Sequence, residues 1–311
     1  MDLGAVIVSY NTRQLTLDCL ATLTDALEAA RLDSHIWVVD NASPDGSAQA
    51  IGAAYPQVTL IASAENLGFA RGTNVGLEAM SAQSSPPRYV LMLNPDTLVD
   101  REALPLLLAF LEQHPRVGVA GPQLRYGDGS FQHSAFRFPT LAMIFFDFWT
   151  IHHRLLDSPL NGRYPRSRYA RGQPFAVDHP LGAAMLTRWE TLQQVGQLDP
   201  GYFMYCEEID WCRRVKRAGW QIYCVPAAQI VHLGGQSTQQ FRERMFVALW
   251  QSRYRLFERH YGPLYRRWAR LIVRAGLRRR LRETEAALRC GDISPEQARQ
   301  RADAYRRVME M

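Results

Sequence analysis

The sequence predicts an α/β fold in which helices cover both faces of a mostly parallel central sheet, followed by a helical C-terminal extension. Short apolar segments alternate with helix-like segments from the start of the chain, and such alternation implies crossover connections between parallel strands. Residues 89–93 are almost wholly apolar, as expected for a strand buried on both faces. Apolar residues make up 47% of the chain and charged residues 21%, which indicates a folded globular protein.

The elements are expected in a regular order. We predict strands at residues 3–9, 36–40, 58–62 and 89–93, and helices at residues 12–31, 47–54, 71–80 and 101–114. The pattern is lost in residues 127–180, which are rich in aromatic residues, Arg, Pro and Gly, and it returns in residues 182–231. Long irregular segments in a compact domain are usually functional or mobile, so residues 127–180 are a candidate functional region.

The charge is distributed unevenly between the expected parts of the chain. We expect one large domain over residues 1–237, built from halves 1–125 and 126–237, and a helical extension over 238–311. Residues 240–311 carry 18 Arg against 8 acidic residues, a balance of +10, whereas the whole chain has a net charge of +6. A basic extension suggests contact with an anionic surface, such as a membrane, a nucleic acid or a pyrophosphate-bearing lipid.

The cysteines and the chain start predict a cytoplasmic protein. The five cysteines are an odd number without a Cys-x-x-Cys pair, which favours reduced thiols over a disulfide framework. The N-terminus leads directly into a predicted strand, so we expect no signal peptide. No run of 18 residues is both free of charge and apolar throughout, so we expect no membrane-spanning segment.

Polar side chains lie at the ends of three predicted strands and define a candidate ligand site. They are Ser9, Tyr10 and Asn11 at the end of the first strand, Asp40 and Asn41 at the end of the second, and Asn94 and Asp96 at the end of the fourth. In a parallel sheet these ends lie along one edge, where open α/β folds bind ligands. Tyr10 can stack on a planar heterocycle and Asp40 can hydrogen-bond to it. The alternative is that these residues only make turns.

Asp96 is also a candidate metal ligand. Pro95 prevents the strand from continuing, so Asp96 is held at its end, where a hard oxygen ligand suits a divalent cation that carries phosphates. The alternative is that Asp96 and Thr97 cap the helix predicted at 101–114. His232 ends another short apolar strand, and an imidazole beside Asp96 would form a mixed site more typical of Mn²⁺ than of Mg²⁺. The alternative is a packed or capping histidine.

Residues 65–76 join the third strand to the fourth through a glycine-rich segment. The glycine spacing is not that of a dinucleotide-binding motif. Small residues near a helix start allow close approach of a ligand, and the helix N–H groups favour anions. Candidate contacts to a phosphate or sugar are therefore Asn66, Gly68, Arg71 and Asn74. The alternative is a tight loop with close helix packing.

Three carboxylates fall within four residues at Glu207, Glu208 and Asp210. One interpretation is a helix N-terminus, where the dipole favours acidic residues and Arg213 and Arg214 are nearby partners. The other interpretation is a general base that is oriented by a neighbouring carboxylate.

In this order, the motifs resemble family 2 glycosyltransferases with the GT-A fold, and among them bacterial rhamnosyltransferase-like enzymes that build cell-surface polysaccharides. The resemblance covers roughly residues 4–235, and the segments that carry it are 8–11, 39–43, 65–70, 93–96, 205–213 and 232–237. Two residues depart from the family pattern. Asn94 stands where an Asp often begins the metal motif, although many rhamnosyltransferase-like members also have Asn-Pro-Asp, and Glu208 stands where an Asp is usual.

The resemblance implies a metal-dependent, inverting transferase that moves a sugar from a nucleotide-sugar donor to a hydroxyl of a saccharide or lipid-linked saccharide. The sugar that it favours is L-rhamnose from dTDP-rhamnose. It implies that Asp40 holds the base, that Asp96 and His232 bind Mn²⁺ or Mg²⁺, and that Glu208 is the catalytic base. The half 1–125 would bind the nucleotide-sugar and the half 126–237 the acceptor, with 177–179, Gly182 and Ala183 near the sugar.

The C-terminal extension has two interpretations. From Phe241 onward, apolar residues recur at helical spacing with arginines between them; they include Phe246, Leu249, Trp250, Tyr254, Phe257, Tyr265, Trp268, Leu271, Ile272 and Leu277. In the first interpretation, these residues pack against the catalytic domain or a second subunit, as in a homodimer. Alternatively, they enter an anionic membrane surface, which would place the protein at the inner face of the cytoplasmic membrane. Residues 141–151 are apolar and have the same two interpretations.

Three other functions each fit part of the sequence. A nucleotidyltransferase would need a glycine-rich loop with a basic residue near the N-terminus, and residues 9–13 lack one. A nucleic-acid-binding protein would explain the basic extension but not Asp96, His232 or the carboxylates at 207–210, so no nucleic acid is expected as a partner. A catalytically degenerate protein that only binds the nucleotide-sugar stays open, and donor hydrolysis would distinguish it.

Overall fold

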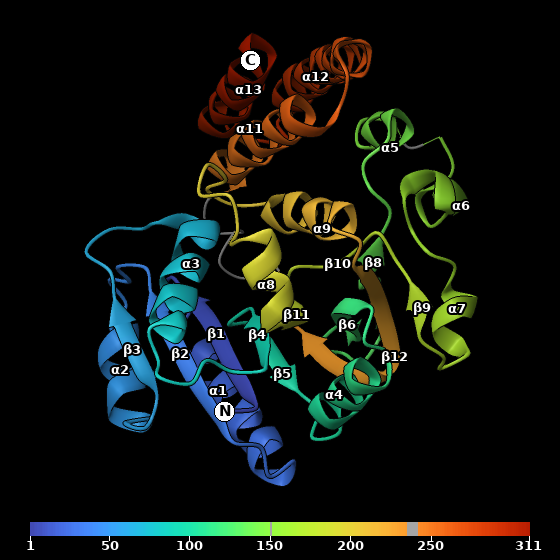
Figure 1. Ribbon diagram of the computed structural model, residues 1–311. Helices are drawn as coiled ribbons and strands as arrows, with labels where there is room; N and C mark the ends of the chain where they lie inside the picture. The colour runs from blue at the N-terminus through green and yellow to red at the C-terminus, as the bar shows by residue number, and fades with distance from the viewer. Residues whose placement is uncertain (150, 235–241) are drawn as a thin grey trace. The chain divides into compact units, whose positions relative to one another are not determined.

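The computed structural model describes residues 1–149, 151–234 and 242–311 (Figure 1). Gly235, Gln236, Ser237 and Phe241, which belong to segments considered above, lie outside the described residues. The described chain forms two compact units. The first comprises Met1–Arg137, Tyr164–Phe203 and residues from Glu207 to 234, and the second comprises Phe138–Arg163, Met204–Cys206 and residues 242–311.

The first unit is built on a mixed sheet with a parallel half. Its strand order is β3 (Thr59–Ala62), β2 (Ser34–Asp40), β1 (Leu3–Ser9), β4 (Tyr89–Leu93), β11 (Ala184–Arg188), β6 (Val117–Arg125), β12 (Gln221–His232) and β5 (Thr97–Val99). The first four strands run parallel, β11 runs antiparallel to both neighbours, β12 is parallel to β6, and β5 is antiparallel to β12. The predicted α/β class is confirmed, and the antiparallel pairs lie beyond β4.

The helices of the first unit follow the strands as the alternation predicted. They are α1 (Arg13–Ala29), α2 (Ser47–Ala54), α3 (Gly68–Ser81), α4 (Ala103–Gln113), α7 (Arg166–Ala170), α8 (Trp189–Val195) and α9 (Glu207–Arg217). The bounds of α2 are as predicted, whereas α3 begins before the predicted Arg71. Asn66 explains this early start, because its Oδ1 accepts a hydrogen bond from the Gly68 N–H at 2.9 Å and sets the first turn.

Both faces of β1 are covered by helices, which is why its burial is continuous. Leu3, Ala5 and Ile7 share one apolar cluster with residues of α1 and α4. On the opposite face, Val6 and Val8 meet the glycines of α3. A Cβ added at Gly76 would overlap the Val6 side chain, so α3 can approach the sheet closely only with glycine at this position.

The irregular region contains several short elements that the sequence pattern did not reveal. In the first unit these are β7 (Phe131–Gln132), β8 (Ala135–Phe136), β9 (Phe175–Ala176) and β10 (His179–Pro180). β7 pairs with β6 and β9 with β12, while β8 and β10 pair with each other. Strands of two residues are too short to show an alternating pattern, so only the tertiary pairing identifies them.

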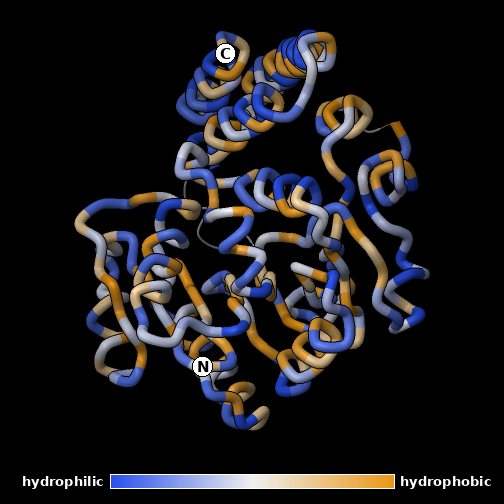
Figure 2. The backbone as a smooth tube through the Cα atoms, viewed as in Figure 1, coloured by the Kyte–Doolittle hydropathy of each residue, from blue (hydrophilic) through white to orange (hydrophobic). Residues whose placement is uncertain are grey.

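The second unit is helical. It contains α5 (Leu141–Phe146), α6 (His153–Leu156), the short 3-10 helix η1 (Pro159–Asn161), and the long helices α11 (Arg242–His260), α12 (Pro263–Cys290) and α13 (Pro295–Glu310). Apolar and polar residues alternate along the three long helices (Figure 2). One apolar cluster of buried residues in this unit consists of Ile144, Phe148, Trp250, Tyr254, Phe257, Ala269, Val273, Leu277 and Val308. The packing interpretation of residues 141–151 is therefore confirmed for Ile144 and Phe148.

Ionic contacts bind the apolar α5 segment to the long helices. The Arg253 guanidinium forms an ion pair with the Asp147 carboxylate, and Arg280 Nη2 donates to the Asp147 carbonyl at 2.7 Å. Asp147, which interrupts an otherwise apolar run, thus serves as the anchor of that run. No helix in the described part of the chain has the length and apolar composition that crossing a membrane requires. The described cysteines form no disulfide.

We expect Gly76→Ala to destabilise the protein by about 1–3 kcal/mol, because the added methyl group would overlap Val6 in a packed layer. Gly52→Ala is the matched control. Gly52 also lies inside a helix, and its added Cβ would be 3.7 Å from Leu60, an ordinary contact, so this variant should be neutral or gain about 0.5–1 kcal/mol. Urea denaturation followed by circular dichroism measures both changes. Equal midpoints for the two variants would contradict close packing of α3.

Candidate active site

The carboxyl ends of β1, β2 and β4 lie side by side, as the parallel sheet predicted. Ser9 is level with Asp40 in the pairing of β1 with β2, and Ile7 is level with Leu93 in the pairing of β1 with β4. Residues that follow these three strands therefore share one edge of the sheet. This is the edge at which open α/β sheets bind ligands.

Buried oxygen atoms after β2 lack partners. Asp40 is 2% exposed; its Oδ2 accepts a hydrogen bond from the Ser43 N–H at 3.0 Å, but its Oδ1 has no partner among the described residues. Asn41 donates to the Gly68 carbonyl at 3.0 Å, and its Oδ1 also lacks a partner in the described part of the chain. A buried acceptor without a partner costs about 1–3 kcal/mol. A ligand that carries an N–H or O–H donor fits this position.

The backbone after β1 and β2 adopts conformations that are unusual for its residues. Asn11 and Ala42 have φ values of 53° and 61°. The Asn11 N–H donates to Ser43 Oγ at 3.0 Å, which ties the two turns together, and Asn11 Oδ1 is a further buried acceptor without a partner among the described residues. Such conformations are concentrated at binding sites. Tyr10, the predicted stacking residue, is half-buried between these turns.

Three predicted nucleotide contacts also have structural roles. Ser9 is fully buried, and its hydroxyl lies 3.2 Å from Thr12 Oγ1 and 3.0 Å from Thr16 Oγ1, so it anchors α1. Asn74 uses both ends of its amide on the Leu198 backbone, at 2.8 and 3.1 Å. The Gly68 N–H and carbonyl are bonded to Asn66 and Asn41. Their hydrogen-bonding groups are used within the fold, and their contact with a ligand stays a prediction.

The glycine-rich segment is explained by close packing. Gly68 has a φ of 77°, and a Cβ there would overlap the Phe203 carbonyl. The Phe69 N–H donates to that same carbonyl at 2.7 Å. Asn66 shapes this turn through its side chain, and Arg71 is half-exposed with its guanidinium 3.7 Å from the Glu65 carboxylate. The segment therefore joins α3 to the loop before α9, and Arg71 is the exposed member of the four predicted contacts in it.

Asp96 is held in place by backbone contacts on both sides. The Asn94 N–H donates to the Ala183 carbonyl at 2.9 Å, and the Leu233 N–H donates to the Asp96 carbonyl at 2.9 Å. Thr97 begins β5, and its hydroxyl donates to the Asn94 carbonyl at 2.7 Å. The capping alternative for Asp96 and Thr97 is wrong, because α4 has Glu102 as its N-cap and no side-chain cap bond.

His232 lies against Asp96 because β12 pairs with β5, where Thr97 is level with His232. His232 Nε2 is 3.4 Å from Asp96 Oδ1, and both residues are buried. On the other side of the ring, Nδ1 is 3.3 Å from Gln132 Oε1. A proton on Nδ1 shared with Gln132 leaves the Nε2 lone pair directed toward Asp96, an arrangement that is common for metal-binding histidines.

The pair fits a divalent cation that is completed by its ligand. Asp96 supplies a hard oxygen and His232 a borderline nitrogen, a donor set that suits Mn²⁺ or Mg²⁺. Among the described residues, no group of three or more His, Cys, Asp or Glu side chains is arranged to hold a metal. A cation at Asp96 and His232 would therefore take further oxygens from diphosphate and water, as is usual where a metal carries phosphates.

The three carboxylates all lie in the first turn of α9, and all are buried. Asp210 is fully buried; its Oδ2 accepts from Arg214 Nε at 2.9 Å, and its Oδ1 is 3.5 Å from the Tyr202 hydroxyl. Arg214 also donates to the carbonyls of Val195 and Gln197, at 2.9 and 2.8 Å. Asp210 thus anchors α9 through the neighbour that the helix-dipole interpretation named.

Glu207 and Glu208 differ from Asp210. Burial, and then the charge of Glu208, raises the pKa of Glu207 well above its usual value. Glu207 Oε2 is buried without a partner among the described residues. Gly182 faces Glu208, because a Cβ added there would lie 3.4 Å from Glu208 Cγ. Gly182 was predicted to lie near the sugar. Because it has no side chain, it leaves space beside Glu208.

Other predicted neighbours of the sugar are used for packing. His179 is stacked on Phe136 with ring centroids 5.9 Å apart, and burial lowers the pKa of His179 to about 4. Asp178 pairs with Lys216 Nζ at 2.6 Å. Sequence reasoning missed Gln132, Ser43 and Phe203. Gln132 lies in a two-residue strand within the irregular region, so no sequence signal pointed to it.

Comparison with known proteins identifies the family of the chain. The family model "Glycosyl transferase family 2" matches residues 5–172, and the model "Glycosyl transferase family group 2" matches residues 89–283. The N-acetylglucosaminyl-diphospho-decaprenol L-rhamnosyltransferase of Mycobacterium tuberculosis is 31% identical over 302 residues, covering 89% of this chain and 94% of that protein. Rhamnosyltransferase WbbL of Escherichia coli is 27% identical over 183 residues, covering 58% of this chain and 66% of that protein.

Solved structures share the fold. The mannosyltransferase PcManGT of Pyrobaculum calidifontis, solved with GDP-Man and Mn²⁺, superimposes with a TM-score of 0.55 at 17% identity, covering 99% of this chain and 84% of that chain. Its likeness shows the fold alone, and it confirms the GT-A architecture that the motifs implied. The family match, the extent of the relatives and the sheet edge lead to one conclusion: the chain belongs to glycosyl transferase family 2, among its rhamnosyltransferase-like members.

Proposed function

We propose that this glycosyltransferase is metal-dependent and inverting, and that it moves L-rhamnose from dTDP-rhamnose to a hydroxyl of a lipid-linked saccharide. The observation that carries the proposal is the set of buried polar groups without partners at one sheet edge. Asp40 Oδ1 and Asn41 Oδ1 at the end of β2 need donors, and the Asp96–His232 pair lies beyond the end of β4, on the other side of β1. A nucleoside diphosphate offers donors on its base and anionic oxygens on its phosphates.

The base of the donor is assigned to the turns after β1 and β2. A pyrimidine such as thymine has one N–H donor, which suits Asp40 Oδ1, and its flat face suits Tyr10. Asn11 and Asn41 supply further acceptors beside it. Thymine and uracil share this N–H group, so Asp40 does not distinguish them, and the choice of dTDP rests on the rhamnosyltransferases that the chain is similar to.

The diphosphate is assigned to Asp96 and His232. They would hold Mn²⁺ or Mg²⁺, which when bound supplies positive charge that stabilises the departing diphosphate. Gln132 orients the His232 ring, and the backbone contacts of Asp96 hold its carboxylate at the strand end. Two further polar groups are proposed for the donor. Asn94 lies beside Asp96 in the same turn, and Arg71 is half-exposed in the first turn of α3.

Glu208 is proposed as the catalytic base. Burial and the Glu208 charge raise the pKa of Glu207, so we assign the negative charge of the pair to Glu208 as part of this proposal. Glu208 then accepts the proton of the acceptor hydroxyl, which attacks the anomeric carbon from the face opposite the diphosphate. A single displacement inverts that carbon and requires no covalent intermediate. Asp210, held by Arg214, positions the first turn of α9.

The acceptor proposal comes from the relatives together with the space beside Glu208. The Mycobacterium tuberculosis relative is named for an N-acetylglucosaminyl-diphospho-decaprenol acceptor. We propose an acceptor of the same class, a saccharide carried on a polyprenyl diphosphate, that reaches Glu208 past Gly182. Because such an acceptor is anchored in a bilayer, the proposed place of work is the inner face of the cytoplasmic membrane.

A donor panel tests the proposed function. Purified protein with Mn²⁺ should hydrolyse or bind dTDP-rhamnose in preference to GDP-mannose and UDP-N-acetylglucosamine, measured as nucleoside diphosphate release and as thermal shift. Thermal stabilisation by dTDP-rhamnose without any release, even with acceptor present, would indicate a protein that only binds the donor. Preference for GDP-mannose or UDP-N-acetylglucosamine would contradict the proposed donor.

Asp96→Ala should abolish the metal-dependent part of nucleoside diphosphate affinity, because it removes the only carboxylate in contact with His232 among the described residues. The fold should persist, since Asp96 lies in the turn between β4 and β5 and is not part of the apolar core. Isothermal titration of dTDP with and without Mn²⁺ measures this effect directly. Asp100→Ala, at a surface ion pair with Arg125, is the control and should bind like wild type. Full metal dependence of dTDP binding in Asp96→Ala would show that the metal does not bind at this position.

Glu208→Gln keeps the shape of the side chain but cannot accept a proton, so turnover should fall by about 10²–10⁴-fold with donor affinity nearly unchanged. Glu207→Gln should retain most of its activity, because the native side chain is already favoured in its protonated form. Asp210→Asn should lower stability more than turnover, because it breaks the ion pair with Arg214. Near wild-type turnover of Glu208→Gln beside an inactive Glu207→Gln would move the base to Glu207.

A further inference from the structure

Helix α12 carries an exposed apolar stripe that the second unit does not cover. Leu264, Trp268 and Leu271 have exposed fractions of 67%, 52% and 47%. Their spacing of four and three residues places them on one face of the helix. The face opposite is occupied by Ala269, Val273 and Leu277, which are fully buried in the helical cluster. The stripe is therefore additional to the residues that the helices need for packing.

The structure divides the apolar residues of the extension into two groups. Trp250 and Phe257 on α11 are each 1% exposed, and Tyr254 is 8% exposed, so all three pack within the helical cluster. For these residues, the packing interpretation of the extension is correct. Trp268 and Leu271 belong to the other group, and Leu264 joins them although the sequence pattern did not single it out.

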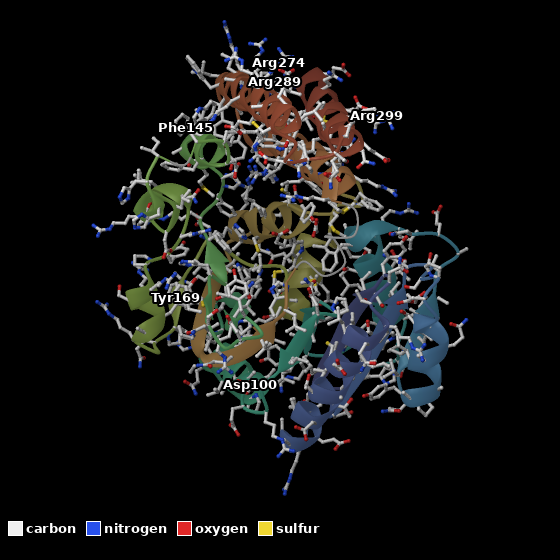
Figure 3. All side chains as sticks on the ribbon, turned by 180° about the vertical axis from the view of Figure 1, so that it is seen from behind. Asp100, Phe145, Tyr169, Arg274, Arg289 and Arg299 are labelled. Atoms are coloured by element: carbon white, nitrogen blue, oxygen red, sulfur yellow. The ribbon has the colours of Figure 1, made fainter. Side chains whose placement is uncertain are left out.

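Positive charge surrounds the stripe on the same helix. Residues 263–282 contain eight arginines and no acidic residue. The exposed ones include Arg267, Arg274, Arg278 and Arg282, and Figure 3 shows Arg274 and Arg289 on α12 and Arg299 on α13. Arg267, Arg278 and Arg282 form no ion pair with any described residue, so their charge is not neutralised within the second unit.

We propose that this face of α12 binds an anionic lipid bilayer, with Trp268, Leu264 and Leu271 in the headgroup region and the flanking arginines on lipid phosphates. An exposed tryptophan between leucines, bordered by arginines, is the composition of helices that lie in the plane of a membrane interface. Long arginine side chains can reach phosphates while their methylene groups stay beside apolar neighbours. The inference concerns a binding surface and does not depend on the reaction proposed above.

A second copy of the chain fits the same face poorly. In a symmetric dimer the stripe would meet itself, which would bring Arg267 and Arg278 of both copies together. Three partly exposed side chains also offer only on the order of a few hundred Å², whereas a stable interface buries ~800 Å² per partner. An anionic surface, in contrast, complements every exposed arginine of the stripe.

Vesicle flotation of the full-length protein, without donor or acceptor, tests the proposal. Wild type should bind vesicles of phosphatidylcholine with phosphatidylglycerol far more than vesicles of phosphatidylcholine alone, and binding should weaken as salt screens the charges. The double variant Trp268→Ser/Leu271→Ser should reduce the partition coefficient at least about tenfold. Arg267→Gln/Arg278→Gln should reduce it roughly 25-fold, about fivefold for each charge removed.

Matched controls separate this face from general surface effects. Leu106→Ser, at a leucine on α4 with an exposed fraction of 37%, and Arg299→Gln on α13 should change binding by less than about twofold. Thermal melts identify any variant that fails to fold, and donor hydrolysis without vesicles should match wild type. No vesicle binding, equal binding to both compositions, or unchanged binding in both double variants overturns the proposal. A dimer in sedimentation velocity that Trp268→Ser/Leu271→Ser dissociates, without vesicle binding, assigns the face to self-association instead.

Discussion

The parallel pairing of β1 with β2 and β4 is the constraint on which the site depends. It brings the ends of three strands to one edge, so that Asp40 and Asp96, far apart in the sequence, lie on either side of β1. The pairing is maintained because β1 is buried on both faces, by the apolar residues of α1 on one and by the closely packed α3 on the other. The glycines of α3 therefore serve the site indirectly, by allowing the layer beneath it to be dense.

Burial without hydrogen bonds distinguishes the residues that are available for chemistry from those that hold the fold. Ser9, Asn74 and Asp210 are buried and bonded to neighbours in the same unit. Asp40 and Glu207 are also buried, but each keeps an oxygen that no described residue satisfies. An unsatisfied buried oxygen destabilises the fold, and on a carboxylate it indicates a group that is completed by a ligand or by proton transfer.

The second unit shows the same separation for apolar residues. Most aromatic side chains of α11 are buried, together with Phe148 and Ile144 from the α5 segment, and this cluster accounts for the helical periodicity of the extension. Asp147 and Arg253 add an ion pair at its border. The apolar residues that remain exposed on α12 are few and lie among arginines, so the chemistry of that face differs from that of a packing surface.

The sequence alone determined the fold class, the strand ends and the family, because buried parallel strands and their polar ends leave strong local patterns. It also marked Asp40, Asp96, Glu208 and His232, whose neighbours along the chain are distinctive. Only the tertiary structure decided which marked residues are already bonded, since Leu198, the partner of Asn74, is remote in sequence. Gln132 was hidden for a related reason: its place beside His232 depends on a strand of two residues, and such a strand has no periodicity to detect.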